Sequence, residues 1–456
     1  MKSYDLAVIG AGSAGLVAAT TAHRLGLKTI LIEKNKIGGE CTHYGCVPSK
    51  ALINSAKAFH AFTKTAELGL PEVAVADQLD FSKVMQSVDD IVQGIYSHET
   101  PEVFEKIGID VMVHNSGAHF LDKTTIQVGG ETISCKYSII CTGSSPRKLD
   151  IPGSENIDFL HNENFWEIRK QPSSIAFIGG GVISAELGQA LTRFGTEVTI
   201  VDHNPEILRV IDEEAQKVIC DIFEKEGIKI VGEAEPIRFE GKHLILNQNG
   251  EEILIDVEKI FVAIGRVPNV SGIQLENALI EYSDQGIKTN EFLQTNTSNI
   301  YSCGDVTTPY KFTHTASHQA NICVHNILNG NSKSNDLSVL PWAIFTDPEI
   351  AHVGLSEKAA RHKFGDSIQV FKVDATIDRF ITDRKTVGFL KVIFDENDLV
   401  IGANAIGQHA GEWLRMLTLV IKNKIPAESM ADTIFAYPTY SEIVKKAFSR
   451  FLRTKQ

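Results

Sequence analysis

Two cysteines, Cys41 and Cys46, are separated by four residues in the stretch GGECTHYGCVPSK, which spans residues 38–50. The thiolate is the reactive form of cysteine, and two neighbouring thiols give up two electrons when they join as a disulfide and regain them when it is reduced. The alternatives are half of a zinc site and two buried thiols. A zinc site needs a second closely spaced pair, and Cys135 and Cys141 have the wrong spacing for one. The spacing therefore favours a redox-active pair, and we expect no metal site.

An internal repeat lies upstream of this pair and must position it. Residues 4–35 align without gaps on residues 173–204, and each segment predicts an apolar strand, a glycine turn, a helix and a second strand. The helical part of each copy carries apolar residues at the 3.6-residue period. The matching positions are Gly10, Gly12, Gly15 and Glu33 in the first copy and Gly179, Gly181, Ser184 and Asp202 in the second.

The repeated pattern is the dinucleotide-binding fingerprint, in which a glycine turn joins a strand to a helix and an acid ends the next strand. The first glycine permits the tight turn, and the second lets backbone amides approach a pyrophosphate. The helix N-terminus adds a favourable dipole, and the acid accepts hydrogen bonds from a ribose diol. Ser184 replaces the third glycine but is small enough to fit. Two copies predict two dinucleotide sites.

Three later segments share one form, an apolar strand followed by a glycine and a polar loop. They are residues 138–153 with Thr142-Gly143, residues 259–269 with Gly265-Arg266, and residues 299–321 with Gly304-Asp305 followed by a helix. The Pro/Gly connector that ends the first of them marks a domain boundary. Between the cysteine motif and that segment, the chain looks helical and then β-rich. From about residue 338 the pattern predicts an α+β domain without a nucleotide fingerprint.

Length, charge and cysteine content narrow the number of domains, the kinds of partner and the cellular location that we expect. A length of 456 residues indicates two to four domains. The net charge of −13 argues against nucleic acid or an anionic membrane as a partner. The apolar N-terminus reads as a strand rather than a signal peptide, and no apolar run is long enough to span a bilayer. Seven cysteines do not make a secreted disulfide framework, so we expect a cytoplasmic protein. The five scattered cysteines are most simply small core residues.

These motifs together resemble the class I pyridine nucleotide–disulfide oxidoreductases, a family that includes dihydrolipoyl dehydrogenase, glutathione reductase and mercuric reductase. The resemblance rests on the cysteine motif, the two fingerprints, and the segments CTG (141–143), AIGRVPN (263–269), CGD (303–305), IFTDPEIAHVGLSE (344–357) and AYPTYSE (436–442). It implies an α/β fold with two Rossmann-like dinucleotide-binding domains, one for FAD and one for NAD(P), and a C-terminal α+β dimerisation domain. The protein would be an obligate homodimer.

The resemblance also implies domain boundaries and residue roles. The FAD domain with the cysteine pair would span 1–150, the NAD(P) domain 151–272, a central segment completing the FAD domain 273–337, and the dimerisation domain 338–456. Cys46 would face the flavin as the charge-transfer thiol, and Cys41 would exchange with substrate. The expected cofactor-binding residues are Gly10, Gly12, Ser13, Ala14, Gly15, Glu33, Lys34, Gly39, Cys41, Thr42, Cys46, Lys50, Gly117, Ala118, Thr142, Gly143, Ser144, Gly179, Gly181, Val182, Ile183, Glu186, Asp202, Gly265, Arg266, Gly304 and Asp305.

Two pairs of side chains complete the expected catalytic set. Lys50 and Glu186 match a family ion pair beside the flavin, although they could also be a surface lysine and an ordinary helix glutamate. Disulfide reductases of this family usually carry a histidine before the proline of HPTxSE, and it acts as acid and base across the dimer. Tyr437 stands at that position here, and Glu442 would either bond Tyr437 or cap a helix. A tyrosine is a poor base at neutral pH but can donate a hydrogen bond.

The expected function is FAD-dependent NAD(P)H:disulfide oxidoreduction with a small-molecule acceptor. The carboxylate of Asp202 favours NADH, and NADPH stays possible because a protonated His203 would attract its phosphate. One alternative is a dihydrolipoyl dehydrogenase or a mercuric-reductase-like enzyme. Mercuric reductases share the tyrosine, and residues 375–392 look like their branch, but no cysteine follows Cys323 to make their C-terminal pair. A second alternative is a quinone, metal-ion or dye reductase that uses flavin directly. A non-catalytic FAD-binding subunit is disfavoured by the intact cysteine pair.

Overall fold

The computed structural model describes residues 1–71 and 79–455. Its N-terminal unit is built on a sheet with the strand order β3-β2-β1-β6-β5-β4, and β18 pairs with β6 at the side of this path. The pairs β2–β3, β1–β2, β1–β6 and β6–β18 are parallel, whereas β4, β5 and β6 pair antiparallel. The strands are β1 (Lys2–Ile9), β2 (Thr29–Glu33), β3 (Asp110–Val113), β4 (Ala118–Phe120), β5 (Thr125–Val128), β6 (Glu131–Ile140) and β18 (Ile300–Ser302).

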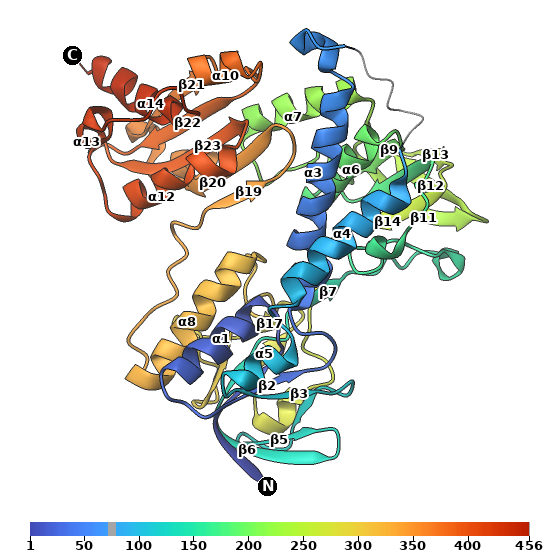
Figure 1. The fold of residues 1–456 in the computed structure, drawn as a ribbon, viewed down its shortest axis with the longest axis vertical. Coiled ribbons are helices and arrows are strands. Elements are labelled where there is room, and N and C mark those ends of the chain that lie inside the picture. The colour runs from blue at the N-terminus through green and yellow to red at the C-terminus, as the bar shows by residue number, and fades with distance from the viewer. Residues whose placement is uncertain (72–78, 456) are drawn as a thin grey trace.

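Helices from distant parts of the chain cover this sheet. α1 and α8 lie side by side on one face in Figure 1, and their small residues pack with β1 and β6 in one apolar core. Alanines on α1 allow this close approach because they add little volume between helix and sheet. The helices of the unit are α1 (Ser13–Arg24), α2 (Gly39–His43), α3 (Cys46–Phe62), α4 (Phe81–Tyr96), α5 (Pro101–Lys106) and α8 (Thr313–Asn329). Because β18 and α8 follow the second fingerprint in the chain, the first sheet is completed by a returning segment.

The second unit repeats the strand–helix–strand arrangement on a smaller scale. Its parallel sheet has the order β10-β9-β8-β14, and an antiparallel sheet, β11-β12-β13, lies beside it. A short antiparallel pair, β7 (Ser144–Pro146) and β15 (Arg266–Pro268), connects the first two units. The remaining elements of the second unit are β8 (Ser174–Ile178), α6 (Val182–Arg193), β9 (Glu197–Val201), α7 (Glu213–Glu226), β10 (Lys229–Val231), β11 (Ala234–Glu240), β12 (His243–Gln248), β13 (Glu251–Ile255) and β14 (Lys259–Val262). The short hairpin that follows, β16 (Tyr282–Ser283) and β17 (Gly286–Ile287), packs with the core of the first unit.

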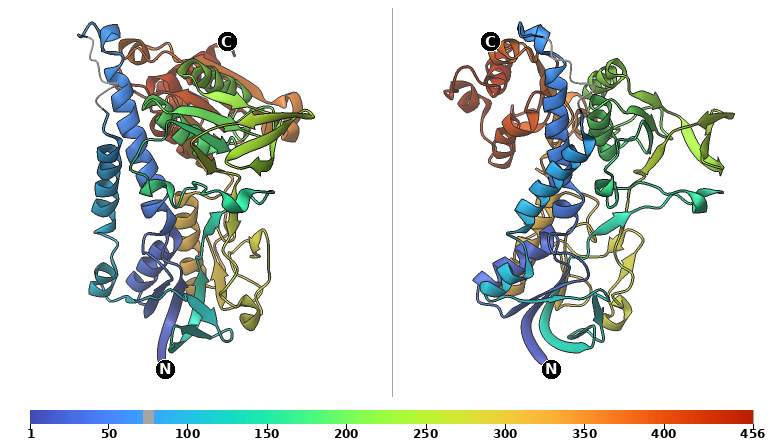
Figure 2. Two further views of the ribbon diagram at one scale, coloured as in Figure 1. Left: turned by 90° about the vertical axis from the view of Figure 1, so that its right-hand side faces the viewer. Right: turned by 45° about the vertical axis from the view of Figure 1, so that its right-hand side comes forward.

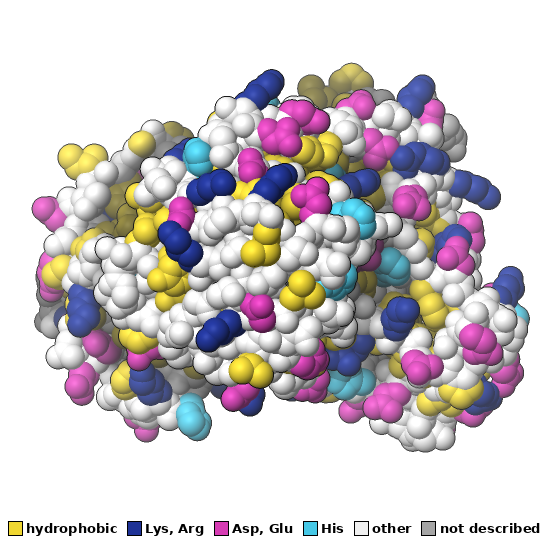
Figure 3. All heavy atoms as spheres, turned by 90° about the horizontal axis from the view of Figure 1, so that it is seen from below, with side chains coloured by type: hydrophobic (Ala, Val, Ile, Leu, Met, Phe, Trp, Pro, Cys, Tyr) yellow, Lys and Arg dark blue, Asp and Glu magenta, His cyan; other side chains and the backbone are white. Residues whose placement is uncertain are grey.

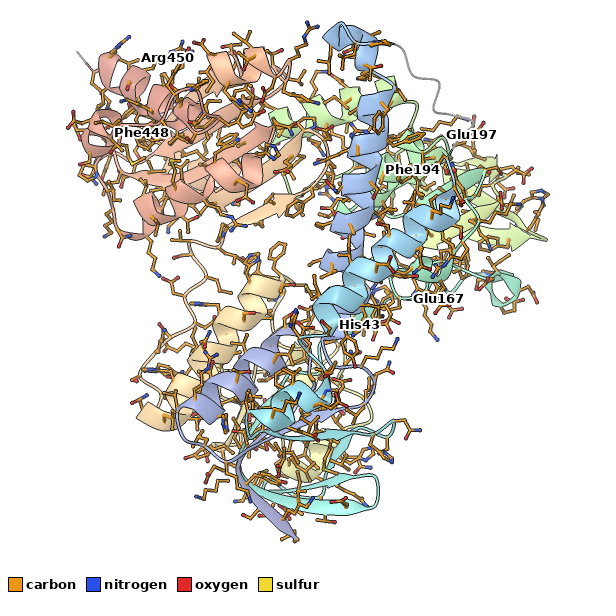
Figure 4. All side chains as sticks on the ribbon, viewed as in Figure 1. His43, Glu167, Phe194, Glu197, Phe448 and Arg450 are labelled. Carbon is orange, nitrogen blue, oxygen red and sulfur yellow. The ribbon has the colours of Figure 1, made fainter. Side chains whose placement is uncertain are left out.

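The C-terminal domain is an antiparallel sheet, β19-β20-β23-β22-β21, with helices packed against it. α14 buries one face on the sheet, where the rings of Phe394 and Phe451 stack with centroids 3.8 Å apart, and Figure 4 marks Phe448 on the same helix. The elements are β19 (Trp342–Ile344), β20 (Glu349–Gly354), α9 (Glu357–Phe364), β21 (Gln369–Asp374), α10 (Asp378–Thr382), β22 (Phe389–Phe394), β23 (Val400–Gly407), α11 (Ala410–Trp413), α12 (Arg415–Lys422), α13 (Ala427–Asp432) and α14 (Glu442–Arg453). The expected α/β fold with two Rossmann-like units and a C-terminal α+β domain is confirmed.

Buried contacts fix the three parts against one another. α3 and α4 run from the N-terminal unit toward the other two in Figures 1 and 2, and Figure 4 shows Phe194 beside α3, where it packs on Phe59. Arg193 on α6 is bonded to Asp347 of the C-terminal domain at 2.8 Å. Lys391 on β22 is buried and reaches Asp212 at 2.9 Å. These contacts place the start of α3, the start of α6 and the start of β19 around one shared space.

The surface carries charge of both signs. In the face drawn in Figure 3, Lys and Arg side chains alternate with Asp and Glu side chains, without a continuous basic stripe on that face. A nucleic-acid-binding surface would instead gather basic residues on one face. In the part of the chain that the structure describes, each helix falls short of the length and apolar character that a membrane crossing requires.

Candidate active site

A cavity of about 1900 Å³ extends from the glycine turn after β1 to the cysteine pair and on to the C-terminal domain. Cavities of this kind, with a few polar groups aimed inward, are where cofactors and substrates bind. Most of the residues expected at cofactors line it: Gly10, Gly12, Ser13, Ala14, Glu33, Lys34, Gly39, Cys41, Cys46, Lys50, Gly117, Ala118, Thr142, Gly143, Ser144, Val182, Ile183, Glu186, Arg266, Gly304 and Asp305.

The first glycine turn leaves room for a ligand backbone. Gly10 has a φ of +98°, and a Cβ on it would lie 2.4 Å from the Cys141 carbonyl oxygen. Gly12 faces open space, since a Cβ there would meet only Gly39, at 3.9 Å. Both oxygens of Glu33 are fixed by backbone amides, Ala11 N at 2.7 Å and Asn35 N at 2.8 Å. This cradle of amides at a helix N-terminus, followed by a fixed carboxylate, fits the pyrophosphate and ribose of a dinucleotide.

The second glycine turn has the same form with one substitution. Gly179 has a φ of +102°, and the hydroxyl of Ser184 donates to the Gly179 carbonyl, which explains how a serine replaces the third glycine. Asp202 accepts the Gly180 amide at 2.6 Å and the Asn204 amide at 2.8 Å. Five of the residues expected at cofactors lie outside the lining of the large cavity: Gly15, Gly179, Gly181, Asp202 and Gly265.

The two cysteines sit on consecutive helices at the cavity wall. Cys41 lies in α2 and Cys46 is the first residue of α3, so its sulfur faces the positive end of a helix dipole. Three groups lower the pKa of Cys46 to about 6. The largest effect is a hydrogen bond from Cys41, and smaller ones come from a hydrogen bond with Thr313 and from the positive charge of Lys50. The Thr313 Oγ1 lies 3.5 Å from the Cys46 sulfur. Bonding to Cys46 and burial raise the pKa of Cys41. At neutral pH the pair therefore holds a thiolate at Cys46 and a thiol at Cys41.

Lys50 and Glu186 form the expected ion pair. Lys50 Nζ lies 2.8 Å from Glu186 Oε2, and the other carboxylate oxygen accepts the Phe345 amide at 2.8 Å. The Lys50 ammonium also sits 4.6 Å above the centre of the Phe345 ring. Glu186 is only 5% exposed, whereas the Lys50 side chain is 34% exposed, so this is a half-buried ion pair with a fixed carboxylate that joins all three parts of the chain beside the cysteines.

A second polar network crosses the cavity between the units. Arg266 donates from Nε to Ser144 Oγ at 2.8 Å and from Nη1 to Glu40 Oε1 at 2.9 Å, and Ser144 in turn donates to Asp305 at 2.8 Å. Burial raises the pKa of Glu40 against the opposing effect of Arg266. Asn162 also donates to Glu40. Glu40, Asn162 and Thr313 were not predicted from the sequence, because their contacts join residues more than a hundred positions apart.

The structure places two of the expected residues in particular contacts. The side chain of Thr42, which is expected at a cofactor, is buried and donates to Glu99 at 2.8 Å, because α2 turns it toward the end of α4. Glu442 does not bond Tyr437. Its carboxylate accepts the Thr439 amide at 3.1 Å, so it fixes the loop that leads into α14.

Tyr437 lies outside this cavity and is 71% exposed. Its hydroxyl donates to Asp378 Oδ2 at 2.7 Å, and this hydrogen bond and the Asp378 charge raise the pKa of Tyr437. In the same loop, Ile434 is 92% exposed. An exposed apolar loop on one side of a domain is typical of a surface that another chain covers. Within the described residues, no group of three or more His, Cys, Asp or Glu side chains is placed to hold a metal ion.

Comparison with known proteins identifies relatives across the whole chain. The model of the family described as pyridine nucleotide-disulphide oxidoreductase matches residues 4–320. The model of that family's dimerisation domain matches residues 340–448. A mercuric reductase of Staphylococcus aureus is 31% identical over 455 residues, which cover 98% of this chain and 82% of that protein. A dihydrolipoyl dehydrogenase of Thermus scotoductus is 33% identical over 464 residues, covering 98% and 97%.

A solved structure extends the likeness to three dimensions. The Cu(II) complex of the HOCl-induced flavoprotein disulfide reductase RclA from Escherichia coli superposes with a TM-score of 0.87 at 25% identity, covering 99% of this chain and 100% of that one. A second structure of the HOCl-induced flavoprotein disulfide reductase RclA from Escherichia coli gives a TM-score of 0.85. The similarity therefore includes the glycine turns, the cysteine pair and the C-terminal domain together.

Proposed function

Because the chain belongs to the pyridine nucleotide-disulphide oxidoreductase family, and is an FAD-dependent oxidoreductase that acts on sulfur groups with NAD(P)H as donor, we propose a specific route through its residues. Electrons from NADH reach Cys46 first, pass to Cys41, and leave on a small acceptor. The supporting observation is the position of Cys46 at the start of α3, in one cavity with the glycine turn of β1 and the Lys50–Glu186 pair.

The residues of the large cavity fit FAD. The open Gly12 and the amides around Gly10 would hold the pyrophosphate, Glu33 the adenosine ribose, and Asp305 the ribityl or phosphate portion. When bound, FAD accepts a hydride from the pyridine nucleotide and gives two electrons to a disulfide. The Lys50–Glu186 pair would fix the local charge beside that chemistry.

The two cysteines differ in protonation, and this difference gives them different roles. Cys46 keeps its negative charge in the reduced pair because Thr313, Lys50 and the start of α3 stabilise a thiolate. Cys41 keeps a proton, so it must lose it to attack an acceptor and regain it after release. The proposed order, Cys46 before Cys41, follows from this difference.

Anaerobic reduction of the yellow protein with NADH tests this arrangement, since a thiolate beside flavin gives long-wavelength absorbance. Because the pKa of Cys46 is lowered to about 6, we expect the band to persist above pH 6 and to decline as pH falls through about 6. Lys50→Met should move this midpoint upward, because it removes a positive charge that favours the thiolate. Lys57→Met, a lysine on the same helix bonded to Glu349, should leave it in place. Absence of the band at every pH would contradict the proposed disulfide route.

The preference for NADH is proposed from Asp202. Its carboxylate is fixed at the end of β9 by two amides, so it cannot turn away from a 2′-phosphate. Asp202→Asn keeps the shape and removes the charge. We expect the ratio of kcat/KM for NADPH to that for NADH to rise roughly tenfold, about 1.4 kcal/mol. Asp221→Asn, on the exposed side of α7, is the matched control. An unchanged ratio would show that Asp202 does not set the preference.

A homodimer is supported by the match to the dimerisation domain. We propose that the exposed loop with Tyr437 reaches the cysteine pair of the partner subunit. With its pKa raised by Asp378, Tyr437 stays protonated and donates a hydrogen bond or a proton to sulfur rather than acting as a base. Asp378, rather than Glu442, is then the carboxylate that orients it.

Tyr437→Phe tests this role. We expect kcat/KM for a small disulfide such as oxidised lipoamide to fall roughly 10- to 100-fold, the effect of one hydrogen bond to a charged group. Reduction of the flavin by NADH should keep its rate, because that step does not use the loop. Tyr440→Phe removes the neighbouring hydroxyl, which bonds Asp383, and serves as the control. Equal losses in the two variants would mean a structural effect of the loop.

The acceptor is proposed as a small disulfide. Relatives described as mercuric reductases and as dihydrolipoyl dehydrogenases match at almost the same identity, so their names do not select one acceptor. The cavity wall offers Cys41 as the exchanging sulfur and Cys46 as its partner, which suits a disulfide directly. Turnover with oxidised lipoamide, glutathione disulfide and an aromatic disulfide, each compared with a quinone, would rank the classes.

A further inference from the structure

Two buried thiols outside the Cys41–Cys46 pair lie side by side. Cys141 follows β6 and Cys303 follows β18, and their sulfur atoms are 3.5 Å apart. Both residues are buried, and both contribute to the wall of the large cavity. The proposed electron route gives them no role.

The sheet register explains why they meet. Ser302 pairs with Ile140 in the parallel β6–β18 ladder, and the next amide, Cys303 N, donates to the Ile140 carbonyl at 3.1 Å. The two cysteines therefore occupy neighbouring positions on adjacent strands. Adjacent strands lie about 4.8 Å apart, within the roughly 4.4–6.8 Å between Cα atoms that a disulfide requires. Their sulfurs must approach by roughly 1.5 Å to form a bond of about 2.05 Å.

The surroundings favour one cysteine as the nucleophile. Cys141 and Cys303 pack in the same apolar core with Cys323 of α8, whose sulfur lies 3.9 Å from the Ser302 carbonyl oxygen. Hydrogen bonds from the Cys141 and Cys323 thiols lower the pKa of Cys303. Burial and the bond to Cys303 raise the pKa of Cys141. A negative charge in this cluster is therefore most stable on Cys303, and the thiolate is the reactive form of cysteine.

We propose that Cys141 and Cys303 are a second redox-active dithiol, which a hydroperoxide oxidises to a disulfide. The Cys303 thiolate attacks one peroxide oxygen, the O–O bond breaks, and the alkoxide takes a proton to leave as an alcohol. The resulting sulfenic acid at Cys303 is attacked by the sulfur of Cys141, and water leaves as the S–S bond forms. In sum, two thiols and one hydroperoxide give one disulfide, one alcohol and one water.

This disulfide would join two turns of the cavity wall. Thr142-Gly143 follows Cys141, and Gly304-Asp305 follows Cys303. On the other side of the pair, the glycine turn after β1 lies close to the Cys141 carbonyl. Oxidation of Cys141 and Cys303 would therefore lock these two turns of the cavity wall together. Cys41 and Cys46 would continue to alternate between disulfide and dithiol.

The test exposes the holoprotein to hydrogen peroxide, alkylates free thiols, digests without reduction and maps linked peptides by mass spectrometry. We expect a Cys141–Cys303 peptide and the loss of four of the seven thiols, against two in Cys141→Ala and in Cys303→Ala. Dithiothreitol should restore all of them. Cys135→Ala is the matched control, since this buried thiol bonds only to the Thr124 carbonyl and the Ser138 hydroxyl. It should keep the linked peptide.

Two results would overturn the proposal. One is a parental protein in which peroxide oxidises Cys41 and Cys46 but leaves Cys141 and Cys303 as thiols. The other is oxidation of Cys303 to a sulfinic acid without a link to Cys141. The same mapping in Cys41→Ser separates this inference from the proposed function, because the linked peptide should form there even though disulfide turnover is lost.

Discussion

Cys41→Ser should lower kcat/KM for disulfide reduction by at least roughly a thousandfold, which is the scale of losing a catalytic nucleophile. The proposed route has no other sulfur that can exchange with the acceptor, because Cys46 holds its charge beside Lys50 and Thr313. Entry of electrons from NADH does not use Cys41. Flavin reduction should therefore keep its rate, and the long-wavelength absorbance of Cys46 should be present without addition of NADH.

The same variant separates the proposed function from direct electron transfer by flavin. A quinone or dye reductase would keep its turnover in Cys41→Ser, whereas a disulfide reductase would lose only its disulfide activity. Cys46→Ser should lose both disulfide turnover and the absorbance band. Cys220→Ser, a partly exposed cysteine on α7, is the matched control and should behave as the parental enzyme. Full disulfide turnover in Cys41→Ser would refute the proposed order of the cysteines.

The parts of the site that depend on local sequence were predicted best. The glycine turns and their acids are set within about thirty residues, because the strand, turn, helix and second strand of each fingerprint are contiguous in the chain. Glu33 and Asp202 accordingly lie at the ends of β2 and β9, where the fingerprint predicts them. The Lys50–Glu186 contact joins residues from two units, and only the family resemblance indicated it.

The side-chain contacts that local sequence does not predict join distant segments. Thr42 is next to the reactive Cys41, but the direction of its side chain is decided by Glu99, which no local pattern reveals. Thr313 begins α8 in the segment where a helix was predicted, and helix starts are anion-favouring positions, so that signal could have placed a helix start near a thiolate. Asp378 replaces Glu442 as the partner of Tyr437 because α10 and the loop before α14 meet only in the folded domain.

The hairpin of β12 and β13 in the second unit has a sequence signal of its own. Asn249-Gly250 lies between two alternating segments, and Asn-Gly is the strongest short-range hairpin signal. The structure forms the β12–β13 hairpin there, and Gly250 has a φ of +90°. The sheet β11-β12-β13 was therefore predictable, whereas its position beside β8 and β9 depends on buried contacts of the whole second unit.

Gly15→Ala should produce a protein that folds but retains little FAD. A Cβ at Gly15 would lie 1.8 Å from the Gly10 carbonyl oxygen, so α1 must move away from the turn that holds the pyrophosphate. Overpacking of this severity costs about 3 kcal/mol, which corresponds to a roughly 100-fold weaker FAD affinity. The measurements are the flavin content of the purified protein and the FAD concentration that restores its absorbance. Gly94→Ala is the control, since a Cβ there meets nothing within 4 Å.

The second fingerprint sharpens this prediction, because the equivalent position already carries a side chain. Ser184 fits there by donating its hydroxyl to the Gly179 carbonyl, a contact that the backbone of the second turn is shaped to accept. If the two turns were equivalent, Gly15→Ser would be as well tolerated as Ser184 is. The contact at 1.8 Å argues that it would not, so Gly15→Ser should lose FAD as Gly15→Ala does. Thermal unfolding with and without added FAD distinguishes the cause, because a protein that has lost only its cofactor cradle keeps its cooperative unfolding and loses the stabilisation that bound FAD provides.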